Sequence, residues 1–183
     1  FLGLFLLSSI LLQAQEEPQD TARYWKMGGA GSLTFSQVSF RNWVSGGEDS
    51  YTLNGLTNWH ANYKKDRLTW ENSVDLGYGI VKQAGRGIRK SDDKLELMSK
   101  YGYKSSSNWY YSGSFNFHTQ FDKGYKYNEA EDTKRQISDF MAPAYALLSL
   151  GMDYKPNEGF SLMVSPLTGK TTFVLNDSLS DQG

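Results

Sequence analysis

The chain has 183 residues with 19 Lys and Arg against 20 Asp and Glu, so its net charge of −1 gives no reason to expect nucleic acid as a partner. It contains no cysteine, which excludes disulfides, thiol catalysis and cysteine-based zinc sites. Its mean hydropathy of −0.56 excludes a bundle of membrane-spanning helices. Membrane β-strands remain compatible with that value, because they interleave polar and apolar residues.

An apolar segment, Phe1–Leu12, opens the chain and is followed by a small residue, Ala14, and an acidic stretch. This order is typical of a secretory signal, and the run falls short of the roughly 20 apolar residues that a spanning helix needs. We therefore predict a signal peptide over residues 1–14, a short periplasmic lead-in over 15–24 and one domain over 25–183. No initiator Met or basic segment precedes the apolar run, so we expect the natural chain to start earlier.

The rest of the sequence alternates with a period of two. In Tyr51–Tyr63 the odd positions are apolar or small and the even positions are polar, with Leu56 as the exception. A strand directs these two sets to opposite faces. The same alternation predicts seven strands in all, near residues 32–40, 51–63, 68–80, 94–104, 109–121, 140–154 and 160–174, with a bulge or kink at Pro166 and Gly169 in the last. We expect an antiparallel meander with no helix after the signal.

The lengths of the connections alternate along the chain. Residues 42–50, 83–93 and 122–139 form long polar connections, whereas 64–67, 105–108 and 156–159 are short. Outer-membrane barrels have short periplasmic turns and longer outer loops. The sequence therefore predicts an all-β, antiparallel up-and-down transmembrane β-barrel, with at least seven strands present and the chain ending before the barrel closes.

Aromatic residues on the apolar face gather beside the short connections. Trp and Tyr favour the boundary between lipid and water, so they are expected to form a membrane-interface belt. The alternative is that they fill the core of a soluble sandwich or lipocalin-like barrel. The belt residues are Trp59, Tyr63, Trp70, Tyr101, Tyr103, Trp109, Tyr111 and Tyr154.

The polar face is expected to line an enclosed lumen. A register in which residue numbers sum to about 175 would pair Glu71 with Lys104 and Asp75 with Lys100. A two-residue turn at Lys65-Asp66 would place His60 beside Glu71. Such pairs indicate a charge ladder that fills a narrow lumen, and the alternative is a selective pore. The lumen candidates are His60, Glu71, Asp75, Lys100, Lys104 and His118.

Enzymatic interpretations find little support in the sequence. His60 and His118 are the only two histidines, too few for a histidine-rich metal site. Ser114 lies four residues before His118 on the same strand, roughly 13 Å away at about 3.3 Å per residue, which is beyond hydrogen-bond reach. We expect no catalytic, cofactor-binding or metal-binding residues and no cofactor.

Several local motifs resemble one family. They are Phe35–Gln37, Asn42-Trp43, Gly46–Glu48, Trp70–Ser73, Asp75–Gly79, Ser91–Lys94, Lys100–Tyr103, Ala142–Tyr145, Leu150–Pro156 and Ser165–Lys170. The family is an uncharacterised group of Bacteroidota envelope proteins, a DUF3078-like domain of unknown function. The resemblance implies an outer-membrane barrel and a full-length member longer than this chain, and it brings no catalytic or ligand residues.

The function expected from these observations is that of a non-enzymatic integral barrel of the bacterial outer membrane, exported through its signal peptide. It would be either a narrow channel or a structural or accessory envelope protein. Outer-membrane lipid is the expected partner, other envelope proteins are further candidates, and nucleic acid is excluded. The alternatives are a barrel enzyme that hydrolyses lipid or peptide, and a soluble ligand-binding barrel.

Overall fold

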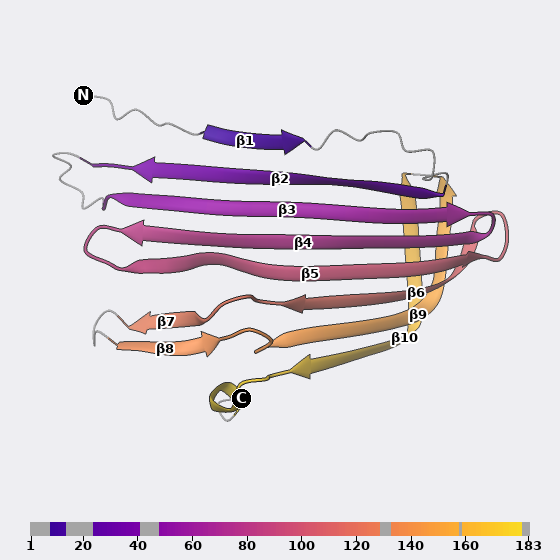
Figure 1. Cartoon of the computed structure of the whole chain (residues 1–183). Helices are drawn as coiled ribbons and strands as arrows, with labels where there is room; N and C mark the ends of the chain where they lie inside the picture. Colours follow the sequence, from indigo (N-terminus) through magenta and orange to yellow (C-terminus); the bar gives the residue numbers. More distant parts are fainter. Residues whose placement is uncertain (1–7, 14–23, 41–47, 129–132, 158, 181–183) are drawn as a thin grey trace.

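The computed structural model describes residues 8–13, 24–40, 48–128, 133–157 and 159–180. Strands account for most of this part of the chain (Figure 1). They are β1 (Ser8–Gln13), β2 (Trp25–Val38), β3 (Ser50–Lys65), β4 (Leu68–Gln83), β5 (Ile88–Lys104), β6 (Trp109–Thr119), β7 (Gly124–Asn128), β8 (Thr133–Ser138), β9 (Ala144–Asn157) and β10 (Phe160–Phe173), followed by a short helix, α1 (Asp177–Ser180).

The main sheet is an antiparallel meander, which confirms the all-β, antiparallel part of the predicted fold class. Its strand order is β1-β2-β3-β4-β5-β6-β9-β10, and every neighbouring pair runs antiparallel. The seven predicted strands correspond to β2–β6, β9 and β10. The described strands leave the sheet open, with β1 and β10 as its edges, and therefore do not form a closed barrel.

The predicted signal peptide and lead-in lie largely outside the described residues. Within them the backbone of β1 is described, and it pairs with residues 30–35 of β2. Cleavage after residue 14 would remove β1, and β2 would then form this edge of the sheet. The signal peptide remains a prediction. Part of the predicted long connection 42–50 also lies outside the described residues.

Three features differ from the prediction. The connection between β4 and β5 spans only residues 84–87, because the charged segment that follows it pairs with β4 across an irregularity at Gly79 and Ile80. The predicted loop 122–139 contains a second, two-stranded sheet, β7–β8. A single helical turn, α1, follows β10, although no helix was expected. All three segments are rich in polar residues. Such a composition is as compatible with exposed strands or a helical turn as it is with a loop, so the sequence did not distinguish them.

The predicted register between β3 and β4 is wrong by two residues. The turn is formed by Asp66 and the residue after it, with Asp66 at a φ of 51°, and Lys65 pairs with Leu68. His60 therefore faces Ser73 instead of Glu71. Asp tolerates the left-handed backbone conformation, so it suits this turn position.

The predicted register between β4 and β5 is wrong by four residues. Glu71 pairs with Lys100 instead of Lys104, and Asp75 pairs with Glu96 instead of Lys100. Charge complementarity was the only basis for the prediction, and one of the observed pairs brings two carboxylates together. The short connection at residues 84–87 and the irregularity at Gly79 and Ile80 set the observed register.

A bulge interrupts the hairpin of β9 and β10. The register shifts between Val164 and Leu167, which leaves Pro166 unpaired and confirms the predicted irregularity there. Proline has no N–H to contribute to the ladder, so it sits where the pairing breaks. In Figure 1 the turn ends of β9 and β10 bend away from the direction of the neighbouring strands. This bend contributes to the curl of the sheet.

Candidate functional site: the concave polar face

The polar side of the sheet is its concave side. Lys155 of β9 reaches Glu71 of β4, with 2.6 Å between Nζ and Oε1, although β5 and β6 lie between these strands in the sheet. Side chains on a flat or convex face diverge and do not meet across three strand spacings of roughly 4.8 Å each. The sheet must therefore curl around this face.

A fully buried carboxylate, that of Asp153, lies beside the Lys155–Glu71 pair. Asp153 is 0% exposed, and its Oδ2 lies 2.6 Å from Nζ of Lys100 and 3.4 Å from Nζ of Lys155. The hydroxyl of Ser161 donates a hydrogen bond of 2.7 Å to Oδ1. We call this group the floor cluster; it consists of Glu71, Lys100, Asp153, Lys155 and Ser161. Its two carboxylates and two ammonium groups balance, and this pairing offsets the cost of burying charge.

A second polar group lies on the same face, farther from the short turns. Nδ1 of His118 is 3.1 Å from Oε1 of Glu96, and Nζ of Lys94 is 3.3 Å from Oε2 of the same carboxylate. Asp75, opposite Glu96, accepts a hydrogen bond of 2.8 Å from the amide of Asn58. The ring of His118 stacks on Tyr145, with centroids 6.2 Å apart and planes at 27°.

Four of the six lumen candidates thus fall into two groups. Glu71 and Lys100 belong to the floor cluster, whereas Asp75 and His118 belong to the second group. His60 is exposed and pairs along the backbone with Ser73, outside both groups. Lys104 lies at the short-turn end of β5, where its N–H donates to the carbonyl of Arg67 at 2.7 Å. Lys155 is absent from the sequence-based candidates because only the curl of the sheet brings it to Glu71. Ser161 is absent as well; it lies on β10, which pairs directly with β9 next to Asp153.

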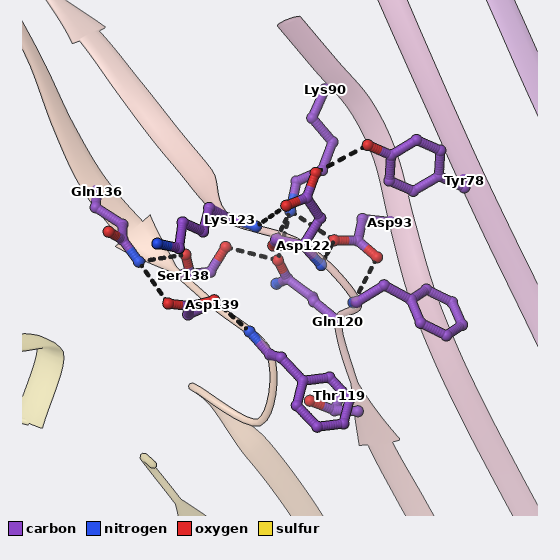
Figure 2. A network of polar contacts seen from close by, with 12 residues as sticks. Tyr78, Lys90, Asp93, Thr119, Gln120, Asp122, Lys123, Gln136, Ser138 and Asp139 are labelled. Atoms are coloured by element: carbon purple, nitrogen blue, oxygen red, sulfur yellow. Dashed lines mark hydrogen bonds and ion pairs between the residues drawn. The ribbon is translucent and has the colours of Figure 1, made fainter. Parts of the chain in front are cut away.

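A third network of polar contacts connects the β7–β8 hairpin to the end of the main sheet that lies away from the short turns (Figure 2). Nζ of Lys90 lies 2.6 Å from Asp93 Oδ2 and donates to the carbonyl of Asp122 at 2.6 Å. The hydroxyl of Ser138, in β8, donates to Gln120 at 2.7 Å. These contacts connect β5, the end of β6 and the hairpin. We call this group, together with Tyr78, Gln136 and Asp139, the rim network.

Two carboxyl groups of the rim network, those of Asp122 and Asp139, have lowered pKa values. The backbone N–H of Lys123 and the hydroxyl of Tyr78 donate to Asp122 and lower the pKa of its carboxyl below 3.8. The pKa of Asp139 is also lowered, chiefly by the backbone N–H of Phe140. Hydrogen bonds to the charged form stabilise the carboxylate.

The other face of the main sheet is apolar and exposed. Trp59 is 54% exposed and Leu148 55%, although both lie on strands that pair on both sides. Asn72 and Ser99 interrupt this face, but they bond to each other at 2.8 Å, and Trp70 donates its indole N–H to Ser99 at 2.8 Å. The predicted belt residues all lie on this face near the short turns. Tyr63 and Tyr154 are half-buried, while those exposed are Trp59, Trp70, Tyr101, Tyr103, Trp109 and Tyr111.

The described residues offer little for metal or nucleophilic chemistry. They contain no group of three or more His, Cys, Asp or Glu side chains that could hold a metal ion. Nδ1 of His118 faces a carboxylate instead of a serine hydroxyl. In the described part of the chain no helix has the length and apolar character needed to cross a membrane.

The fold and the site define an open antiparallel meander with a polar, cross-bridged inner face and an apolar outer face. Residues 35–125 match the model of a family described as "Protein of unknown function (DUF3078)", a segment that includes all of β3–β6. This match confirms that the chain resembles a DUF3078-like family. No curated protein and no solved structure matches the chain.

Proposed function

We propose that the protein is an integral β-barrel of a bacterial outer membrane with no enzymatic activity. The observation that carries this proposal is the inverted distribution of polarity across the sheet. Asp153 is 0% exposed on the inner face, whereas Trp59 is 54% exposed on the outer face. A soluble β-barrel places its apolar residues inside, and soluble monomers rarely expose large continuous apolar patches. Acyl chains are the solvent that suits the outer face.

The open edge of the sheet sets a further requirement for this proposal. A bilayer offers no hydrogen-bond partners, so each unpaired backbone group costs several kcal/mol there. The outer edge of β10 pairs with no described strand. In the membrane it must pair with another strand, and closure of the barrel satisfies this requirement.

The floor cluster favours a structural or accessory role over a wide pore. Its ion pairs join β4, β5 and β9 across the inner face, and such a bridge narrows the space through which a solute passes. A narrow channel is the second candidate, favoured by the polar lining at the level of Asp75 and His118. A barrel hydrolase has less support, since His118 is paired with Glu96.

Heat-modifiable migration in detergent gels tests the membrane proposal. A folded outer-membrane barrel migrates differently in unheated and boiled samples, and the folded form should also float with vesicles in a density gradient. A chain that folds in plain buffer and stays out of the vesicle fraction would contradict the proposal. Conductance in planar bilayers then distinguishes the two roles: silence with intact insertion supports the structural role, and discrete steps support the channel.

A further inference from the structure

We propose that the second polar group on the concave face is a binding pocket for a small organic cation, a primary amine on a short alkyl chain. The pocket has a volume of about 300 Å³ and lies between β4, β5, β6 and β9. This is at the lower end of the volumes of ligand sites. Its walls include Asp75, Glu96, Met98, His118, Tyr145 and Leu147.

The charge of the pocket points to the sign of the ligand. Asp75 and Glu96 stand directly opposite each other on paired strands, an arrangement that like charges disfavour. Glu96 has Lys94 at 3.3 Å and His118 at 3.1 Å, whereas Asp75 accepts a hydrogen bond only from the neutral amide of Asn58 among its described contacts.

The carboxylates of the floor cluster, on the same face, differ from Asp75 in their ion pairing. There each carboxylate has a lysine Nζ at 2.6 Å. Among the described residues, Asp75 forms no ion pair, so its negative charge faces the pocket uncompensated. A ligand ammonium beside Asp75 supplies the missing counter-charge and relieves the repulsion between the two carboxylates.

The walls favour an alkylammonium over a bare metal ion. Tyr145 presents an aromatic ring next to His118, and Leu147 adds an aliphatic side. A ring face attracts a cation, and an aliphatic wall accommodates methylene groups. Nζ of Lys170 already lies 4.9 Å from the centroid of the Tyr145 ring, so a ligand ammonium must share this ring with it. Lys170 and Lys94 are the two nearby cations that limit the affinity of the pocket for the ligand.

The inference goes beyond the proposed function and does not rest on membrane insertion, because the pocket is built within strands that pair in the described sheet. The test is calorimetric titration of the full chain with 1,4-diaminobutane, in detergent micelles or in plain buffer, whichever circular dichroism shows to contain the folded chain. Butane-1,4-diol has the same chain without charge and serves as the ligand control. We expect the diamine to bind with a dissociation constant in the millimolar range or below and the diol to show no binding.

The variants identify the site. Asp75→Asn removes the uncompensated charge and should weaken diamine binding by about tenfold, equivalent to one ion pair. Asp92→Asn makes the same chemical change on β5 outside the pocket and should leave binding unaltered. Circular dichroism shows that each variant is folded.

The outcomes are distinct. Three results would each overturn the proposed cation pocket. They are equal binding of diamine and diol, an equal loss of diamine affinity in Asp75→Asn and Asp92→Asn, and no diamine binding by a folded chain. Binding of a neutral sugar with the same affinity as the diamine would do so too, since it would show that the polar groups and not the charge select the ligand. None of these results depends on vesicle flotation, so failure of the pocket and failure of the membrane proposal are separately visible.

Discussion

Lys155 of β9 and Glu71 of β4 form an ion pair of 2.6 Å, although two strands of the sheet lie between their own. The pair therefore bridges the curve of the sheet instead of joining neighbours in a ladder. Lys155 also lies 3.4 Å from Asp153, so one ammonium group connects two carboxylates on different strands. The pair contributes to the curvature as well as to the pairing of charge.

A double-mutant cycle should detect this bridge. Lys155→Met and Glu71→Gln each remove one partner, and both side chains are partly solvated, with 22% and 37% exposure. We expect a coupling free energy of about 1 kcal/mol, since solvent screens part of the attraction. Guanidinium unfolding in detergent micelles measures it. Additive effects of the two changes would show that the pair does not join β4 to β9.

Asp153 should be the most sensitive charged position of the floor cluster. Asp153→Asn leaves Lys100 without its nearest counter-charge in a buried setting, and breaking a buried pair costs about 3 kcal/mol or more. The same unfolding assay measures the loss. Glu48→Gln breaks an exposed pair with Arg86 at 3.6 Å and is the control, with an expected loss below about 1 kcal/mol. Similar losses in both variants would contradict the burial of Asp153.

The outer face gives a prediction about membrane affinity. Leu148→Arg places a charge in the middle of β9, where a bilayer would resist it by about 2–4 kcal/mol. Leu175→Arg makes the same change at a position that is 69% exposed beyond the end of β10, and it should have little effect. Vesicle partitioning of the two variants against the unchanged chain measures the difference. Equal partitioning would count against lipid as the solvent of this face.

The sequence predicted most strands and both faces because alternation depends only on neighbouring residues. Tyr51–Tyr63 alternates with one exception, and it forms a strand with its apolar side chains on the outer face. Register depends on which turn residue adopts a left-handed conformation and on where a strand bulges. Asp66 and the irregularity at Gly79 set the β3–β4 and β4–β5 pairings, and neither follows from a hydrophobic pattern.

The floor cluster was only partly predictable for a related reason. Glu71 and Lys100 lie on neighbouring strands, so alternation was enough to assign both to the lumen face. Lys155 shares a face with Asp153 by the same alternation, but its partner on β4 depends on the curvature of the whole sheet. The β7–β8 hairpin escaped prediction because its residues are mostly polar on both faces, and its attachment consists of hydrogen bonds with no periodic signal.

The lowered pKa of Asp122 gives a prediction about the stability of the protein at low pH. Its carboxyl has a lowered pKa in the folded protein, so its contribution to stability is present above the ordinary value of 3.8 and is lost as the pH falls through the lowered value. Tyr78→Phe removes a hydrogen bond of 2.9 Å to this carboxylate and should raise the pKa towards 3.8. Carbon-13 NMR of the labelled carboxyl measures the midpoint, and Tyr51→Phe is the control. An unchanged midpoint in Tyr78→Phe would exclude the hydrogen bond in solution.

Two glycines of the β9–β10 hairpin form a matched pair for testing the bulge. A Cβ at Gly151 would overlap the carbonyl oxygen of Val164 and lie 2.7 Å from Cα of Ser165, both in the backbone of the bulged segment. Backbone cannot move aside as a flexible side chain can, so Gly151→Ala should destabilise the protein by about 1–3 kcal/mol.

Gly169 is the control position, since a Cβ there meets no atom within 4 Å. Gly169→Ala should be neutral or slightly stabilising, because alanine restricts the unfolded chain more than glycine does. Guanidinium unfolding of the two variants in detergent micelles compares them directly. If Gly151→Ala is as stable as Gly169→Ala, the bulge is not packed against β9 as described, and the bend of this hairpin needs another cause.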